Sequence, residues 1–122
     1  MSWQKEKGTS FETEVVRYGR SHGLMLWRKP LHGARDEGDV DGYEINGRPV
    51  TAELKNCKDM RLSEFTNQAR VEAENAGTPY FVVIHKRKGA GARNFGLTYV
   101  TTTLECWNRM VKDSKERDGG GR

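Results

Sequence analysis

The chain has 122 residues, of which 34% are hydrophobic and 31% are charged, and its formal net charge is +4. This length suits one domain, which we expect over residues 1–112 with a flexible charged tail over residues 113–122. No stretch approaches the roughly 20 apolar residues of a membrane span, and no secretory pattern opens the chain. We therefore expect a cytoplasmic protein of a bacterial cell or of a phage-infected host, with no membrane partner.

The charged residues and cysteines are distributed unevenly. Cys57 and Cys106 have neither the spacing of a disulfide framework nor that of a zinc site, so we expect two reduced thiols. Acid concentrated inside a basic chain indicates a metal site that faces a polyanion. The acidic segment contains Asp36, Glu37, Asp39 and Asp41, and the basic segment contains Lys86, Arg87, Lys88 and Arg93.

The first half of the chain predicts one helix and three strands. Residues 1–8 are polar, and Ser10 can cap a helix that begins near Phe11 and ends at Gly23. A short strand is expected over 24–28 and a loop over 33–38. Two further strands, 39–45 and 49–56, are joined by Asn-Gly, the strongest short-range hairpin signal.

The second half predicts a helix capped by Ser63 that ends at Gly77, and then a buried strand over 80–85. A basic loop over 86–94, a strand over 96–100 and a helix over 103–112 follow. The order α-β-β-β-α-β-β-α predicts an α/β fold with a mixed β-sheet flanked by helices. Four aromatic residues are expected in the core: Trp27, Tyr80, Phe81 and Trp107.

The strand over 49–56 contains Glu-Leu-Lys, and alternation places Glu53 and Lys55 on one face of the sheet. Hairpin pairing brings Asp39 or Asp41 across from Glu53, so that two carboxylates meet. An exposed, solvated Glu-x-Lys face and an ordinary polar turn are the alternative interpretations of the same residues.

Two carboxylates and a lysine suit the hydrolysis of a phosphodiester. Mg²⁺ is usually held by one or two carboxylates together with substrate phosphate, and it lowers the pKa of a bound water. A nearby lysine can orient that water and offset charge on the phosphate oxygens. We expect Asp39 and Glu53 to be ligands of Mg²⁺, with Mn²⁺ as a possible substitute, and Lys55 to position the water.

With Gly-Asp-Val-Asp (38–41) and Glu-Leu-Lys (53–55), the chain resembles the PD-(D/E)XK nucleases. Within them it looks like the Holliday junction resolvases of archaeal and phage type, from about Lys7 to Thr102. Its opening, Lys-Gly-Thr-Ser-Phe-Glu-Thr-Glu (7–14), is similar to the start of the archaeal resolvases, which implies that Glu12 contributes to the metal site. The alternative for Glu12 is an acid in the first turn of the expected helix that complements the helix N-terminus. The segment 33–40 is similar to small resolvase-like proteins of actinobacterial phages.

The chain departs from this family pattern at two places. Gly38 stands where the family name has a proline, and Asp41 competes with Asp39 as the metal ligand. The resemblance also suggests an accessory role for Gln68, on the helix after Glu-x-Lys. Phosphate contacts are expected from six basic residues: Lys58, Arg61, Lys86, Arg87, Lys88 and Arg93.

The resemblance implies a restriction-endonuclease-like core and a metal-dependent DNA endonuclease, with a four-way junction as the favoured substrate. One centre cuts one strand and a junction needs two cuts, so a symmetric homodimer is expected. The alternatives are another nicking, structure-specific or exonuclease enzyme of the same superfamily, or a relative that binds DNA without cutting it.

Overall fold

The structure is a computed structural model that describes residues 3–30 and 37–116, with side chains from residue 10 onward. The expected loop over 33–38 therefore falls mostly outside the described residues. The same holds for the expected tail beyond residue 116.

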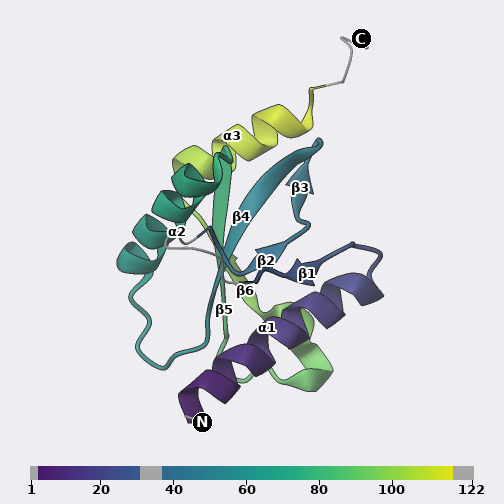
Figure 1. The fold of residues 1–122 in the computed structure, drawn as a ribbon, viewed down its shortest axis with the longest axis vertical. Coiled ribbons are helices and arrows are strands. Elements are labelled where there is room, and N and C mark those ends of the chain that lie inside the picture. The colour runs from purple at the N-terminus through teal and green to yellow at the C-terminus, as the bar shows by residue number, and fades with distance from the viewer. Residues whose placement is uncertain (1–2, 31–36, 117–122) are drawn as a thin grey trace.

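A mixed sheet of six strands forms the centre of the fold (Figure 1). Five strands lie in the order β1-β2-β4-β5-β6, and β3 pairs with β4 outside this path. The β4–β5 pair is parallel, whereas the other pairs are antiparallel. The strands are β1 (Trp27–Arg28), β2 (Val40–Asp41), β3 (Glu44–Ile45), β4 (Arg48–Lys55), β5 (Tyr80–His85) and β6 (Tyr99–Thr101).

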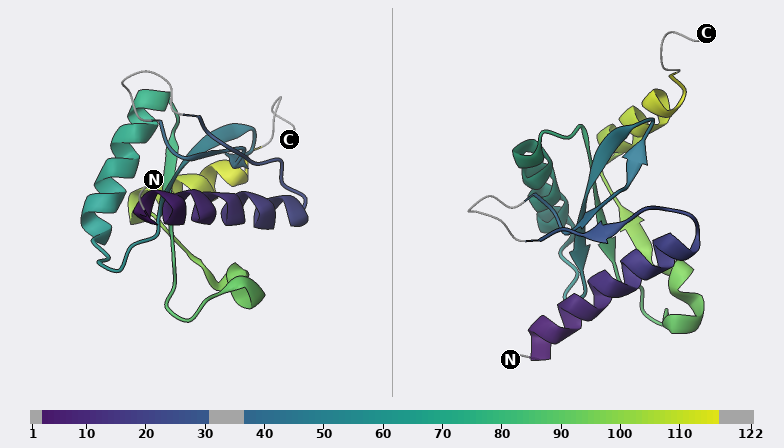
Figure 2. Two further views of the ribbon diagram at one scale, coloured as in Figure 1. Left: turned by 60° about the horizontal axis from the view of Figure 1, so that its bottom comes forward. Right: turned by 45° about the vertical axis from the view of Figure 1, so that its right-hand side comes forward.

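Three α-helices and one 3-10 helix flank this sheet, as the expected α/β class requires. In Figures 1 and 2, α2 runs alongside β4 and β5, and α1 crosses near the carboxyl ends of those strands. The described helices are α1 (Trp3–Ser21), α2 (Leu62–Ala76), η1 (Ala92–Leu97) and α3 (Leu104–Ser114).

The parallel strands β4 and β5 form the core between the helices. All six residues of β5 are buried, and five of them are apolar or aromatic, as is typical of a strand covered on both faces. Phe11 and Val15 of α1 and Phe65 and Ala69 of α2 pack against this pair as part of one hydrophobic cluster. The centre of the sheet is thus a rigid support for side chains that project near the ends of β4 and β5.

Several predicted helix boundaries are wrong. Helix α1 begins at Trp3 and not near Phe11, so Ser10 lies inside the helix and does not cap it. The polar segment before Phe11 contains Gln, Glu and Lys, which are good helix formers. Helix α2 begins at Leu62, one residue before the expected cap Ser63.

The expected ends of the later helices are closer to the structure. Helix α2 ends at Gly77, whose φ of 73° is left-handed and whose N–H bonds to helix carbonyls, as predicted. The hydroxyl of Thr103 caps α3, which continues to Ser114, two residues beyond its expected end. A 3-10 helix over 92–97 replaces part of the expected loop and of the strand over 96–100.

The prediction of a core position is wrong for two of the four aromatic residues. Tyr80 and Phe81 are buried, but Trp27 and Trp107 are 48% and 56% exposed. Trp27 belongs to the edge strand β1, and Trp107 lies on α3 away from its buried residues, Cys106 and Met110. Among the described residues, no helix is long and apolar enough to cross a membrane.

Candidate active site

The acidic segment and β4 do not pair as a continuous hairpin, so the single strand expected over 39–45 is divided into β2 and β3. Near the turn, Glu44 pairs with Pro49. Farther along, Val40 pairs with Ala52. From Glu44 back to Val40 the chain covers four residue steps. From Pro49 to Ala52 the opposite strand covers only three, so the acidic segment contains one extra residue. This is a β-bulge, and it reverses which side chains face the core.

The bulge depends on Gly42. Its φ is +114°, and a Cβ at this position would collide with the carbonyl oxygen of Met25. Without the extra residue Asp41 would lie opposite Ala52 and point into the core. With it, Val40 is buried there, and its two aspartate neighbours project toward the opposite face.

Asp39, and not Asp41, is the aspartate beside Glu53. Oδ2 of Asp39 accepts a hydrogen bond from the backbone N–H of Leu54 at 2.9 Å. The carboxyl group of Asp39 is close enough to that of Glu53 to raise the pKa of Glu53. Asp41 instead forms an ion pair with Lys29, with 3.4 Å between Oδ1 and Nζ. Asp36, the first acid of the segment, lies outside the described residues.

Glu53 is buried, with 5% of its surface exposed, so the alternative interpretation of a solvated Glu-x-Lys face is wrong. Its Oε2 is 3.4 Å from Nζ of Lys55 and accepts a hydrogen bond of 3.2 Å from Gln68. Its Oε1 is also buried and has no hydrogen-bond partner among the described residues. Burial, and then the nearby carboxyl groups of Glu72 and Asp39, raise the pKa of Glu53 to about 10.

Helix α2 supplies the far side of this centre. Nε2 of Gln68 donates to Oε2 of Glu53 and also to Oε2 of Glu72, at 3.2 Å and 3.0 Å. Glu72 is 2% exposed and was not identified from the sequence. The available signal was its position four residues after Gln68, which places both on the same face of a helix.

Glu12 approaches the centre from α1. Its side chain is half-buried, and Arg28 of β1 donates to its Oε1 at 3.1 Å. Burial and the charge of Asp39 raise the pKa of Glu12, whereas Arg28 lowers it. Glu12 is therefore near enough to Asp39 to interact with it electrostatically.

The donor set fits a divalent cation held in part by substrate. No group of three or more His, Cys, Asp and Glu side chains is arranged as a complete metal site in the described part of the chain. Mg²⁺, however, usually needs only one or two carboxylates, because waters and substrate phosphates complete its coordination. Asp39 and Glu53 supply such a pair, and Oε1 of Glu53 accepts no hydrogen bond within the described residues, which suits a cation ligand.

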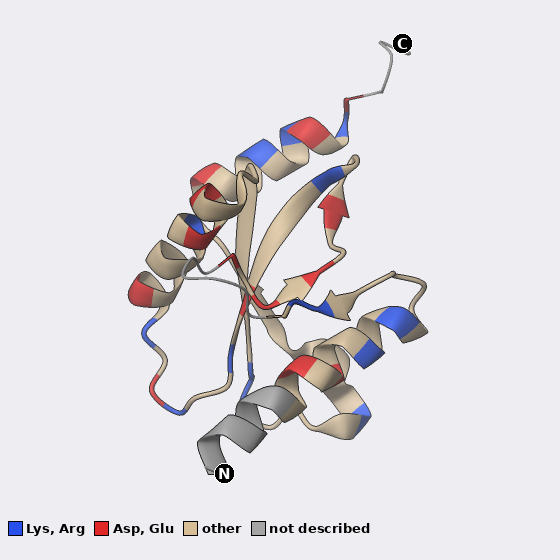
Figure 3. Cartoon of the chain, viewed as in Figure 1, with Lys and Arg blue, Asp and Glu red and all other residues tan. Residues whose placement is uncertain are grey.

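Basic residues gather next to this centre, around a cavity of about 980 Å³ at the carboxyl ends of β4 and β5. Four of the six basic residues expected to contact DNA line it: Lys58, Lys86, Arg87 and Lys88. Figure 3 shows the lysine and arginine positions near these strand ends, next to the acidic positions at the middle of the sheet.

The other two expected DNA contacts lie outside this cavity. Arg61 forms ion pairs with Asp59 and Glu64, at 2.9 Å and 3.6 Å, which satisfy much of its charge. Arg93 belongs to η1 and is exposed there, outside the lining of the basic cavity.

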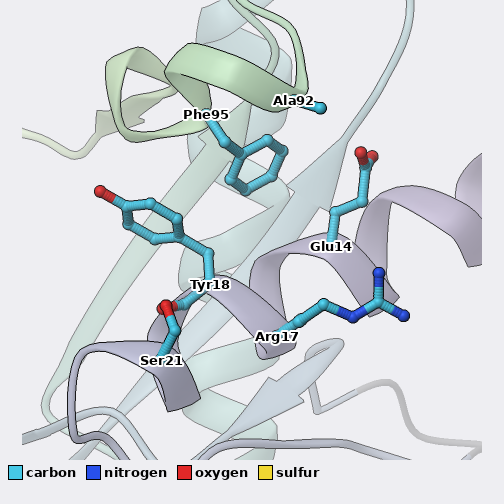
Figure 4. Close-up of a pocket in the computed structure, with 6 residues that line it drawn as sticks. All are labelled: Glu14, Arg17, Tyr18, Ser21, Ala92 and Phe95. Atoms are coloured by element: carbon cyan, nitrogen blue, oxygen red, sulfur yellow. The ribbon is translucent and has the colours of Figure 1, made fainter.

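A smaller cavity of about 290 Å³ lies between α1 and η1 (Figure 4). The rings of Tyr18 and Phe95 approach each other there, with 5.6 Å between their centroids, and Phe95 also contacts Phe11. Glu14 and Arg17 lie along one side of it. Asp39 and Glu53 do not line this cavity, and its aromatic contacts attach η1 to α1.

No family model matches this chain, and no curated protein matches it.

Proposed function

We propose that this chain is a metal-dependent DNA endonuclease of the PD-(D/E)XK type with a restriction-endonuclease-like core. The observation that carries the proposal is the meeting of Asp39, Glu53 and Lys55 beside a basic cavity. A mixed sheet flanked by helices is compatible with the core that the resemblance implies, although four strands, and not the expected three, precede α2.

Asp39 and Glu53 would hold Mg²⁺ or Mn²⁺, which polarises the scissile phosphate and makes hydroxide available near neutral pH. Lys55 lies 3.4 Å from Glu53, where its ammonium group can orient the attacking water and offset charge on the phosphate oxygens. Gln68 holds Oε2 of Glu53, which fixes the direction of the other oxygen. Glu12 is a further acidic group at the edge of this centre.

The basic cavity supports a polyanionic substrate. Its four lysine and arginine side chains can pair with phosphate groups without reading bases. A four-way junction is the substrate we favour, on the resemblance to junction resolvases, and resolution of a junction requires two symmetric cuts. We therefore propose a two-fold symmetric homodimer as the active form.

The test is cleavage of an end-labelled synthetic four-way junction in Mg²⁺ by the wild type, Glu53→Gln and Lys55→Ala. Lys112→Ala is the matched control, because Lys112 is an exposed lysine on α3. We expect paired symmetric nicks from the wild type and the control, and binding without cleavage from the other two variants. Cleavage by Glu53→Gln at the wild-type rate would overturn the assignment of the centre.

Substrate and oligomeric state have separate tests. Flap, nicked and linear DNA in parallel lanes identify another structure-specific, nicking or exonuclease activity. Tight junction binding without wild-type cleavage in Mg²⁺ or Mn²⁺ would indicate a protein that binds DNA without cutting it. Light scattering during gel filtration measures the mass, and a monomer with full resolving activity would contradict the homodimer.

A further inference from the structure

The basic cavity has features that phosphate binding alone does not require. It opens on the face of the sheet that also holds Lys55, where the loops after β4 and β5 leave the strands. Beyond its lysines and arginines it has apolar and aromatic walls and a polar floor. The walls include Met60, Leu62 and Tyr99, and the floor is formed by His85 and Thr101.

Tyr99 is an exposed planar surface within this cavity. It is 47% exposed, although it belongs to strand β6. The guanidinium of Arg87 lies 5.4 Å from the centroid of its ring. Nucleobases stack on exposed aromatic rings and on arginine guanidinium planes, and Arg87, whose side chain is itself exposed, can move aside to admit a base at this ring.

His85 forms the floor and lies beside Tyr99, its register partner on the neighbouring strand. It is 4% exposed, its ring centroid is 5.5 Å from that of Tyr99, and its Nε2 is 2.7 Å from Oγ1 of Thr101. Burial lowers its pKa, which favours the neutral imidazole. Nδ1 is buried, and a backbone interaction with Lys86 partly offsets the effect of burial on the pKa of His85.

The cavity lies one strand away from the candidate centre. His85 is the register partner of Lys55 in the parallel β4–β5 pair, and neighbouring strands are about 4.8 Å apart. A nucleotide in the cavity would therefore be adjacent to a phosphate held at Lys55. Lys58, Lys86 and Lys88, on the two loops that border the cavity, are placed to contact the flanking phosphates.

We propose that this cavity binds an unpaired nucleotide next to the phosphate that is cut, with its base stacked on Tyr99 between the basic loops. The inference rests on the proposed endonuclease function and narrows its substrate. A perfectly paired duplex keeps its bases stacked on one another, whereas a branch point, flap or single strand can supply an unpaired base. The site therefore favours DNA with unpaired nucleotides over intact duplex.

The experiment measures binding in EDTA, so it does not depend on cleavage. A single-stranded oligonucleotide of about 12 nucleotides, within the range of known single-strand sites, carries a fluorescent base analogue and is compared with the same sequence in duplex form. We expect the wild type to quench the analogue and to prefer the single strand. Tyr99→Leu should weaken single-strand binding about 5- to 150-fold, the range for loss of one stacked base.

Two further variants make the result specific. Tyr99→Phe keeps the ring and should keep both affinity and quenching. Trp107→Leu removes an exposed aromatic from α3, outside the cavity, and should behave as the wild type. Single-strand affinity and quenching unchanged in Tyr99→Leu would overturn the proposal, and so would loss of binding in Tyr99→Phe with normal thermal unfolding.

The two proposals fail in different ways. If the wild type cuts DNA in Mg²⁺ but Tyr99→Leu binds and quenches normally, the base site is wrong and the endonuclease stands. If the wild type quenches the analogue through Tyr99 but never cuts DNA with any divalent cation, the endonuclease is wrong and the nucleotide site stands.

Discussion

Glu53 and Asp113 are two buried carboxylic acids near opposite ends of the β4–β5 pair, and the protein treats them differently. Asp113 accepts a hydrogen bond of 2.6 Å from the hydroxyl of Tyr80 and lies 3.3 Å from Arg48, and these partners lower its pKa. Glu53 has one amide and one lysine on Oε2 and no partner for Oε1 among the described residues, and its pKa is raised.

The difference separates a structural acid from a candidate functional one. An acid that serves only stability is surrounded by donors, because an unsatisfied buried oxygen costs free energy. An acid that must bind a cation keeps an open oxygen and carries that cost until the cation arrives. Asp41 is neutralised by a basic partner, Lys29, as Asp113 is by Arg48. Asp39 instead lies beside the carboxyl group of Glu53 and raises its pKa.

The largest expected effect compares the two aspartates of the acidic segment. Asp39→Asn should reduce DNA cleavage about 100-fold or more, because a metal ligand contributes several kcal/mol to the transition state. Asp41→Asn removes an acid whose partner is Lys29, so its cleavage rate should stay within about threefold. Single-turnover cleavage in Mg²⁺ measures both rates, and a reversed order would move the centre to Asp41.

The second prediction compares stability. Without metal at neutral pH, Glu53→Gln should raise the free energy of unfolding by about 1–3 kcal/mol, because the amide removes the cost of keeping a buried carboxyl there. Asp113→Asn should lower the melting temperature, since it weakens contacts to Tyr80 and Arg48. Urea unfolding in EDTA shows whether each variant is more or less stable than the wild type. A Glu53→Gln variant that is less stable than the wild type would contradict the view that Glu53 costs stability.

The third prediction is the pH dependence of that difference. The pKa of Glu53 is about 10 in the folded chain against an ordinary value of 4.5. The folded state therefore holds a proton that the unfolded state releases, and the stability from this group is lost as pH rises from 4.5 toward 10. Since glutamine does not titrate, the advantage of Glu53→Gln over wild type should grow steadily between pH 5 and about pH 9.

Metal binding should counteract the loss of wild-type stability at high pH. A cation must displace the proton of Glu53, so the increase in melting temperature caused by Mg²⁺ should be larger at pH 9 than at about pH 6. Glu53→Gln should show no such increase at either pH. Differential scanning fluorimetry with and without Mg²⁺ measures this, and an equal increase in both proteins would place the cation elsewhere.

The sequence predicted those parts of the fold that depend on local signals. β5 and β4 follow from apolar and β-branched runs, and the end of α2 follows from Gly77. Lys55 beside Glu53 follows from strand alternation alone. These features hold because each depends on neighbours within a few residues.

Features that depend on distant contacts could not be predicted in this way. The bulge that brings Asp39 to Glu53 depends on Gly42 approaching Met25, seventeen residues earlier in the chain. The burial of Asp113 depends on Tyr80, which is 33 residues away. Trp27 is exposed because β1 lies at the edge of the sheet. The order of the strands in the sheet cannot be predicted from the hydrophobicity of a residue.

The smallest predicted effect tests how Glu53 is held in place. Gln68 donates to both Glu53 and Glu72, so Gln68→Ala leaves two buried carboxyl groups without their common donor. We expect the Mg²⁺ concentration for half-maximal cleavage to rise about 3- to 10-fold, at or below the usual effect of losing an outer partner of a metal ligand. The rate at saturating Mg²⁺ should change little, because the contacts of Gln68 are to Glu53 and Glu72 and its role is to position Glu53. Asn67→Ala, on the exposed side of α2, is the control, and an equal shift in both variants would reduce the role of Gln68 to support of the helix.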